Sequence, residues 1–414
     1  MYSILLVIIY FSFISLGLPD SLIGSAWPIM HLDLGVSMSS MGIVTIIISF
    51  GTIIASLCSN FLTNKLGTGL VSAISVGLTA IALLGFSFAK AFWMLCVFAV
   101  PYGLGAGAID AALNNFVALN YSARHFNWLH CMWGVGASVS PYIMSLALTT
   151  GLGWGSGFRI VFYIQIALTV LLFFTLPIWK KGLKPSVPSV QTGDSPQRNT
   201  DFDNPPQNKV TTLSVFKIKG IFLVFIAFLA YCAMEQTAGI WATSFLVNYK
   251  GIDAVVASKF ASFFYIGITV GRAITGFFAD KVGDKRLIRY GTLIILSGIL
   301  LVALPVSVSW CALAGLIVIG LGCAPIYPAI VHSTPSNFGK ENSQAIIGLQ
   351  MAFAYVGSTF MPPLFGVLAQ KISVGIYWIY LLVFALLMLV TCEILNAQIK
   401  RKRFVKCDEY ERLK

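Results

Sequence analysis

Residues 67–89 read GTGLVSAISVGLTAIALLGFSFA, a stretch without one charged side chain. A helix needs about 20 apolar residues to cross the hydrocarbon core of a bilayer, so this stretch is long enough to span a membrane. Similar runs recur along the 414 residues, which are 57% hydrophobic and 10% charged. Soluble domains carry charge at about a quarter of their positions. The composition therefore excludes a soluble enzyme with one anchor and predicts a membrane protein with many crossings.

Hydropathy and turn residues together predict twelve such crossings. We expect a helix at each, because the bilayer core offers backbone groups no hydrogen-bond partners. The sequence also lacks the alternating segments of about ten residues that are typical of membrane β-barrels. The predicted spans are 4–30, 38–60, 67–89, 92–118, 126–150, 157–179, 216–248, 254–279, 287–305, 309–332, 342–370 and 375–399.

A polar segment separates the sixth predicted span from the seventh. Between Lys180 and Lys219 the composition changes to Pro, Ser, Asn, Asp and Lys, which buries too little apolar surface to fold. The chain then consists of six spans plus six, as expected for two halves joined by a linker. The predicted units are an N-terminal half at 1–180, a cytoplasmic linker at 181–213, a C-terminal half at 214–399 and a basic cytoplasmic tail at 400–414.

The net charge of +12 points to lipid as a partner rather than to nucleic acid. Basic residues lie between and after the apolar runs and form no continuous stripe. Their excess in alternate loops places both termini and the linker in the cytoplasm by the positive-inside rule. Short loops favour a bacterial inner membrane, while the long Asn- and Pro-rich linker leaves a eukaryotic membrane open. We expect a monomer in the lipid bilayer.

The loop after the eighth span carries a family resemblance. It reads Gly276-Phe-Phe-Ala-Asp280-Lys281-Val-Gly283-Asp-Lys285-Arg286 and resembles the cytoplasmic loop signature of the major facilitator superfamily. The loop after the second span keeps the Lys and Gly but has Asn64 in place of the acid. An Asp at a helix end can hold neighbouring helices together by charge-assisted bonds, although an ordinary positive-inside loop is the alternative. The predicted latch residues are Asp280, Lys281, Gly283, Arg286, Lys65 and Gly67.

The fourth and fifth spans carry a narrower resemblance. They contain GLGAGAIDAALNN at 103–115 and FNWLHCMWGVGA at 126–137. These segments resemble the fucose permease group of sugar and proton symporters, in which a Gly-rich fourth helix carries an acid followed by Asn. GCAPIYP at 322–328 is similar to that group's tenth helix. The resemblance implies an all-α membrane fold of twelve helices in two pseudo-symmetric six-helix halves. His130 and Trp133 depart from the amide side chains of the fucose permease, so the solute is expected to differ.

Acidic residues inside the spans are the candidates for ion coupling. An ionised side chain there costs about 2.5–3.5 kcal/mol on insertion scales, so each acid should face a cavity or be protonated. Asp110 matches the group's fourth-helix acid, and Asp20 is similar in position to its first-helix acid. We therefore predict that Asp110 and Asp20 couple proton movement to transport, a structural role in helix packing being the alternative. Glu235 has no firm counterpart, and pairing with Arg272 is the alternative to a role in binding.

A sugar site needs polar groups for the hydroxyls and an aromatic surface for the apolar ring face. The spans supply both kinds of side chain. Asn127, His130 and Trp133 are spaced by three and can border one opening on the fifth span, whereas packing between helices is the alternative for the single aromatic residues. The predicted solute-binding residues are Asp20, Asn114, Asn127, His130, Trp133, Glu235, Trp241, Tyr327 and Gln350.

No motif indicates an enzyme, a metal centre or an ATP-driven pump. The sequence has no Gly-x-Ser-x-Gly elbow and no Walker loop, and its four histidines and eight cysteines follow no ligand or disulfide spacing. We therefore predict a secondary transporter without cofactor, which imports a monosaccharide or similar polar solute by proton symport through alternating access. Sodium-coupled sugar symport, efflux and a non-transporting nutrient receptor are the alternatives.

Overall fold

The computed structural model describes residues 2–37, 40–181, 214–304 and 309–412, which are helical apart from short turns. The N-terminal half consists of α1 (Tyr2–Asp20), α2 (Leu22–Asp33), α3 (Met41–Leu66), α4 (Thr68–Ser87), α5 (Phe92–Asn120), α6 (Ala123–Thr149), α7 (Trp154–Phe174) and α8 (Leu176–Lys181). The C-terminal half consists of α9 (Ile221–Asn248), α10 (Ala254–Val282), α11 (Asp284–Ala303), α12 (Ser309–Cys323), α13 (Ile326–His332), α14 (Thr334–Phe338), α15 (Ser343–Lys371) and α16 (Tyr377–Arg412).

The predicted all-α membrane fold is confirmed. Eleven segments of the described chain are long and apolar enough to cross a membrane, and α10, with 29 residues, runs beside them as the twelfth. Two crossings are broken into two helices each. Pro19 lies where α1 gives way to α2, and Pro325 lies where α12 gives way to α13, because proline lacks the N–H that continues a helix.

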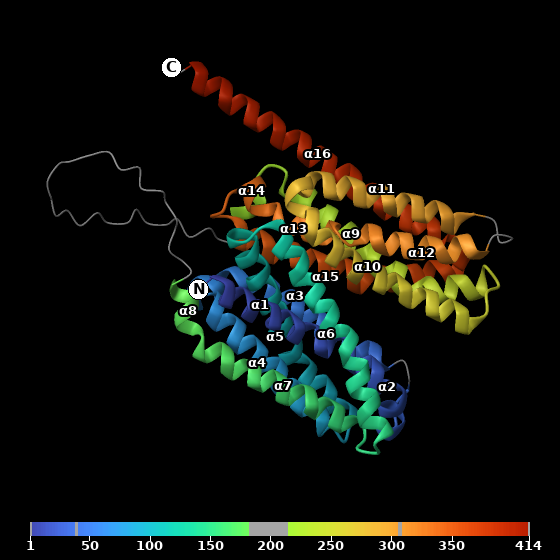
Figure 1. Cartoon of the computed structure of the whole chain (residues 1–414). Helices are drawn as coiled ribbons and strands as arrows, with labels where there is room; N and C mark the ends of the chain where they lie inside the picture. Colours follow the sequence, from blue (N-terminus) through green and yellow to red (C-terminus); the bar gives the residue numbers. More distant parts are fainter. Residues whose placement is uncertain (1, 38–39, 182–213, 305–308, 413–414) are drawn as a thin grey trace.

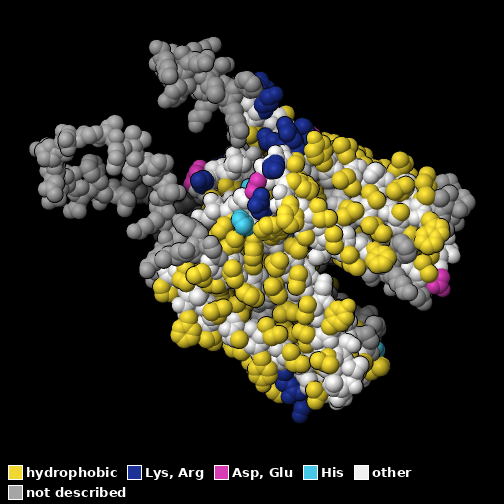
Figure 2. Space-filling model, viewed as in Figure 1, with side chains coloured by type: hydrophobic (Ala, Val, Ile, Leu, Met, Phe, Trp, Pro, Cys, Tyr) yellow, Lys and Arg dark blue, Asp and Glu magenta, His cyan; other side chains and the backbone are white. Residues whose placement is uncertain are grey.

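The helices form two bundles that lie side by side, the N-terminal one blue to green and the C-terminal one yellow to red (Figure 1). The main contacts between the bundles are made by α6 with α10 and by α3 with α15. These contacts lie toward the side of the molecule where the termini are found. At the opposite side the bundles part, and a notch opens between them (Figure 2).

Glycines on α5 allow α3 to approach it closely. A Cβ added at Gly103 would lie 2.2 Å from the Ile48 carbonyl oxygen, and one added at Gly107 would lie 2.3 Å from the Thr52 carbonyl oxygen. Only glycine permits such backbone approach between membrane helices. The close packing fixes the face of α5 that carries Asp110, one turn beyond Gly107.

The predicted linker, 181–213, lies outside the described residues apart from Lys181. The last helix, α16, continues past the predicted boundary at residue 399 as far as Arg412, so the basic tail begins as an extension of the twelfth crossing. Most visible Lys and Arg side chains gather on the side of the molecule that holds the termini (Figure 2).

Candidate functional site

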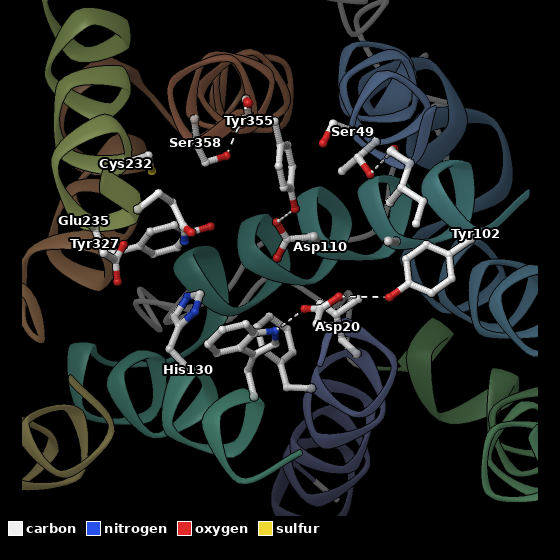
Figure 3. A pocket seen from close by; sticks show the side chains of 18 of the residues that line it. Asp20, Ser49, Tyr102, Asp110, His130, Cys232, Glu235, Tyr327, Tyr355 and Ser358 are labelled. Atoms are coloured by element: carbon white, nitrogen blue, oxygen red, sulfur yellow. Dashed lines mark hydrogen bonds between the residues drawn. The ribbon is translucent and has the colours of Figure 1, made fainter. Parts of the chain in front are cut away.

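A cavity of about 270 Å³ lies between the two bundles and is lined by both (Figure 3). α1, α3, α5 and α6 contribute from the N-terminal half, and α9, α10, α13 and α15 contribute from the C-terminal half. Its wall combines carboxylates, one guanidinium group, hydroxyls and aromatic rings. The polar and aromatic lining residues are Phe13, Asp20, Ser49, Thr52, Tyr102, Asp110, His130, Trp133, Glu235, Gln236, Arg272, Tyr327, Tyr355 and Ser358.

The carboxylate of Asp110 joins the two halves. On one side it accepts a hydrogen bond from the hydroxyl of Tyr355 on α15, at 2.8 Å. On the other it accepts one from Nδ2 of Asn114, one turn further along α5, also at 2.8 Å. Figure 3 shows Tyr355 pointing across the cavity onto Asp110. Each carboxylate oxygen is therefore held from a different half of the protein.

Asn114 determines how His130 presents its ring to the cavity. Asn114 Nδ2 also donates to the Asp110 backbone carbonyl oxygen at 2.9 Å, so the amide nitrogen faces two oxygens and the amide oxygen must face the other way. That oxygen lies 3.1 Å from Nε2 of His130, which must then carry the proton. In a neutral ring Nδ1 is left as an acceptor. Because His130 lines the cavity, it can accept a hydrogen bond from a hydroxyl group.

Asp20 is held entirely within the N-terminal half. Its Oδ2 accepts a hydrogen bond from the indole Nε1 of Trp133 at 2.8 Å, and its Oδ1 accepts one from the hydroxyl of Tyr102 at 3.1 Å. Both donors are uncharged, and among the described residues no ion pair involves Asp20. A carboxylate held by neutral donors can take up a proton without breaking an ion pair.

The C-terminal wall carries a buried ion pair. Arg272 lies 3.5 Å from Glu235, and the two side chains are 6% and 12% exposed. Glu235 therefore pairs with Arg272, which was the alternative to a role in binding, and both residues also line the cavity. Arg272 Nε has no hydrogen-bond partner in the described structure, and its guanidinium lies 5.9 Å from the ring of Tyr327. The ion pair therefore lies beside an aromatic surface, with Arg272 Nε buried behind it.

Four predicted binding residues do not line the cavity. Asn114 acts behind it through Asp110 and His130, as described above. Asn127 is buried and donates to the Ala123 carbonyl oxygen of its own helix at 2.9 Å. Three residues turn a helix by about 300°, so Asn127 lies about 60° away from His130 around α6. Trp241 donates to the Pro362 carbonyl oxygen at 2.9 Å, and Gln350 accepts from Thr334 at 2.8 Å. Their binding role stays a prediction: none of the four lines this cavity, and Asn127 Oδ1 and Gln350 Nε2 are buried without a hydrogen-bond partner among the described residues.

Two tyrosines that reasoning from sequence missed hold the carboxylates. Tyr102 stands two turns before Asp110 on α5, so a search for polar residues at helical spacing from that acid would have found it. Tyr355 lies in the other half, and its partner depends on how the two bundles pack. No local signal in the sequence carries that information.

Asp280 connects the halves on the side of the termini. Its Oδ1 accepts from the backbone N–H of Arg124 at 3.0 Å, and its Oδ2 accepts from the hydroxyl of Ser122 at 2.9 Å. Ser122 is the N-cap residue of α6 and makes no capping bond with its own side chain. A carboxylate from α10 therefore caps α6, where free N–H groups and the helix dipole favour negative charge.

The other predicted latch residues shape the two loops. Gly283 and Gly67 precede α11 and α4 with φ values of 81° and 79°, a conformation that favours glycine. The side chains of Lys281, Arg286 and Lys65 are exposed, and the Lys65 ammonium lies 5.7 Å from the Phe61 ring. These basic residues lie beside the contact between halves rather than within the bonds that form it.

The corresponding contact at the start of α15 uses amides instead of a carboxylate. Asn64, which replaces the acid, donates to Asn60 on its own helix at 3.0 Å. Across the halves, Asn115 donates to Gln344 at 2.7 Å, and Gln344 donates to Ser59 at 2.7 Å. The hydroxyl of Ser343 also donates to Asn115. The two contacts between halves are thus related by pseudo-symmetry but differ in charge.

Comparisons with known proteins agree over most of the chain. Residues 9–294 and 223–402 match the family described as the Major Facilitator Superfamily. "Bypass of stop codon protein 6" of Saccharomyces cerevisiae is 24% identical over 401 residues, which cover 92% of this chain and 80% of that protein. The "Glucose/mannose transporter GlcP" of Bacillus subtilis is 23% identical over 300 residues, covering 72% of this chain and 70% of that protein.

A further relative carries a different activity in its name. The "Quinolone resistance protein NorA" of Staphylococcus aureus is 23% identical over 372 residues, covering 87% of this chain and 89% of that protein. Among solved structures, FucP, the fucose:proton symporter of E. coli, superposes in its outward conformation with a TM-score of 0.76 at 14% identity, covering 95% of this chain and 99% of that one. At this identity the superposition shows the fold alone.

Proposed function

This chain belongs to the Major Facilitator Superfamily, and on that premise we propose that it imports a monosaccharide or similar polar solute together with protons. It is a multi-pass integral membrane protein. The observation that carries the proposal is the cavity between the halves, where Asp20 and Asp110 face a wall of polar and aromatic side chains. The name of the B. subtilis relative, a glucose/mannose transporter, supports a sugar as the solute.

The cavity suits a small polyol. Its volume of about 270 Å³ lies near the lower end of ligand sites, which is about 300 Å³. Trp133 and Tyr327 offer ring surfaces for the apolar face of a sugar. His130 accepts from a hydroxyl through Nδ1, while Glu235 and Arg272 provide an acceptor and a donor on the facing wall. The solute would therefore contact both halves at once.

The coupling step that we propose uses the bond between Asp110 and Tyr355. An ionised carboxylate accepts a stronger hydrogen bond than a protonated one, so the two halves are held more firmly when Asp110 is charged. Protonation loosens this bond as the solute occupies the cavity, and the halves can then rock. One proton moving down 100 mV supplies about 2.3 kcal/mol, enough for roughly fiftyfold accumulation.

The arrangement of the halves corresponds to one end of an alternating-access cycle. The side with the termini is held by Asp280 and by the Asn115 contact, and the opposite side is open. The concentration of basic residues near the termini supports a cytoplasmic location for both ends by the positive-inside rule. With that orientation the cavity faces outward, ready to load solute from outside.

Tyr355→Phe is expected to lower proton-driven accumulation of the solute about tenfold without unfolding the protein, because the halves can then rock before Asp110 is protonated. The change removes one hydrogen bond to a charged group, worth about 1.5–3 kcal/mol, and keeps the ring. Tyr380→Phe is the matched control, because that hydroxyl donates to the Met361 carbonyl oxygen at 2.8 Å and does not line the cavity. Accumulation ratios in proteoliposomes under an imposed pH gradient, measured for both variants, check this. Equal accumulation in the two variants would remove Tyr355 from the coupling step.

Asn114→Leu is expected to raise KM for the solute about fivefold, as the loss of one hydrogen bond of about 1 kcal/mol would do. Leucine keeps the volume but no longer fixes the proton on Nε2 of His130. Asn120→Leu serves as the control, since among the described residues Asn120 donates to the Phe116 carbonyl oxygen of its own helix at 2.8 Å. The measurement is the concentration dependence of uptake. An unchanged KM in Asn114→Leu shows that the ring of His130 does not bind the solute.

The proposal is tested by a thermal-shift screen of monosaccharides on the purified protein, followed by uptake of the best ligand under an imposed pH gradient. We expect accumulation when the outside is acidic. A sodium gradient that drives uptake at constant pH would favour sodium symport instead. Solute leaving vesicles against its gradient would favour efflux, the activity suggested by the name of the S. aureus relative. Binding without counterflow would favour a receptor.

A further inference from the structure

Gln165 lies on α7, outside the transport cavity, and its side chain is buried. Its amide Nε2 donates to the backbone carbonyl oxygen of Ser15 on α1 at 2.7 Å, and its Oε1 accepts from the hydroxyl of Ser15 at 2.8 Å. The hydroxyl of Thr79 on α4 donates to the same Oε1 at 3.3 Å. One buried amide therefore joins α1, α4 and α7.

The carbonyl group that Gln165 bonds is one that α1 itself leaves without a partner. In an α-helix each carbonyl oxygen accepts from the N–H four residues later. Ser15 lies four residues before Pro19, and proline has no N–H and crowds the carbonyl group at that spacing. A buried carbonyl group without a partner is costly. Gln165 thus supplies, from another helix, the hydrogen bond that Pro19 removes from α1.

Asp20 is the cavity residue that this bond supports. It follows Pro19 directly as the last residue of α1, and α2 begins at Leu22. Its side chain is exposed within the cavity that it lines, where Tyr102 and Trp133 donate to its two oxygens (Figure 3). The direction in which α1 ends determines whether the carboxylate meets these two donors. A bond that fixes the last turn of α1 therefore fixes Asp20.

We propose that Gln165 is a positioning residue for transport, which acts through the Ser15 carbonyl group to hold Asp20 in the cavity. The inference rests on the proposed function, in which Asp20 binds the solute or its coupled proton. Gln165 touches neither, because a whole helix separates it from the cavity. Its effect on transport is therefore indirect and runs through the break in α1.

The second broken crossing has a corresponding contact in the C-terminal half. α12 ends at Cys323, and the last carbonyl groups of a helix have no partner within it. The hydroxyl of Tyr231, which is buried on α9, donates to the Cys323 carbonyl oxygen at 2.9 Å. Tyr327, four residues further on, lines the cavity. In each half a buried side chain from a neighbouring helix thus bonds a carbonyl group at a break, close to a residue of the cavity.

The test measures KM and Vmax of monosaccharide uptake in proteoliposomes for two variants of α7. Gln165→Met keeps the length of the side chain but removes the donor to Ser15. Thr169→Val is the matched control, because the hydroxyl of Thr169 is buried one turn further on and donates within its own helix, to the Gln165 carbonyl oxygen at 2.8 Å. We expect Gln165→Met to raise KM roughly tenfold and Thr169→Val to leave KM as in the wild type.

The split between KM and Vmax separates positioning from folding. A variant that only reduces the number of folded transporters lowers Vmax and keeps KM, so an unchanged KM in Gln165→Met would overturn the inference while leaving wild-type transport, and with it the proposed function, in place. A wild type that takes up no monosaccharide would contradict the proposed function, and the inference would fail with it.

Pro19→Ala provides a second comparison, which does not depend on transport. Alanine restores the N–H at position 19, so the Ser15 carbonyl oxygen can be bonded within α1. Gln165→Met should then lower Tm less in the Pro19→Ala protein than in the wild type, and the rise in KM should shrink in the same way. Equal losses of Tm in the two backgrounds would show that Gln165 does not act through the bond that Pro19 removes.

Discussion

Asp110→Asn is expected to abolish proton-driven accumulation of the solute while preserving its exchange across the membrane. Asparagine has the shape of a protonated aspartic acid and can still bond with Tyr355 and Asn114, but it cannot release a proton. Accumulation at 100 mV should therefore fall from roughly fiftyfold to equilibration. Counterflow should continue, because exchange needs no net proton movement. Both quantities are measured in proteoliposomes with the solute found by the ligand screen.

Asp33→Asn provides the matched control for this experiment. Like Asp110, Asp33 accepts a hydrogen bond from an uncharged donor, Nε1 of Trp154 at 2.7 Å, but it does not line the transport cavity. The Asp33→Asn variant should accumulate solute to the same level as the wild type. If Asp110→Asn does the same under a pH gradient, Asp110 carries no coupled proton, and Asp20 becomes the remaining candidate among the predicted pair.

The second large effect is expected from Asp280→Ala, which should open the side of the protein that holds the termini. The change removes the acceptor for the Arg124 N–H and the Ser122 hydroxyl, together with the negative charge at the start of α6. A lost cap of this kind costs about 1–2 kcal/mol, which shifts the balance between outward and inward states by roughly fivefold to thirtyfold. Distances between spin labels at the termini-side ends of α3 and α15 measure the shift.

Glu393→Ala is the control for the latch. The carboxylate of Glu393 on α16 bonds to Nε of Arg289 on α11 at 2.6 Å, within the C-terminal half. Its loss should leave the label distances as in the wild type. Identical distance distributions in Asp280→Ala and the wild type would show that the amide contact around Asn115 holds the halves closed without help from the carboxylate.

Much of the fold could be predicted from sequence because the bilayer restricts the choices. Apolar length identifies a crossing, and only helices satisfy the backbone there. The predicted span at 92–118 thus corresponds to the observed one at 92–120. Helix ends are harder to predict, since polar side chains continue a helix into the headgroup region, as Asn64 and Lys65 do at the end of α3.

The candidate site was predictable where its residues are related by local spacing. Asp110, Asn114 and His130 form one network on α5 and α6, two helices joined by a short turn. The bonds between Tyr355 and Asp110, and between Glu235 and Arg272, depend on the packing of whole helices. Asn127, Trp241 and Gln350 show the opposite problem, because a polar group in a membrane helix can donate to or accept from a neighbouring carbonyl or side chain outside the cavity, as these three do.

The most direct test of proton symport is the movement of protons caused by the solute itself. Wild-type proteoliposomes are held at zero membrane potential, and the solute is added outside while the external pH is recorded. We expect the external medium to become more alkaline as protons enter with the solute, and we expect no change with Asp110→Asn. Solute entry into the wild-type proteoliposomes without any change in external pH would contradict proton symport.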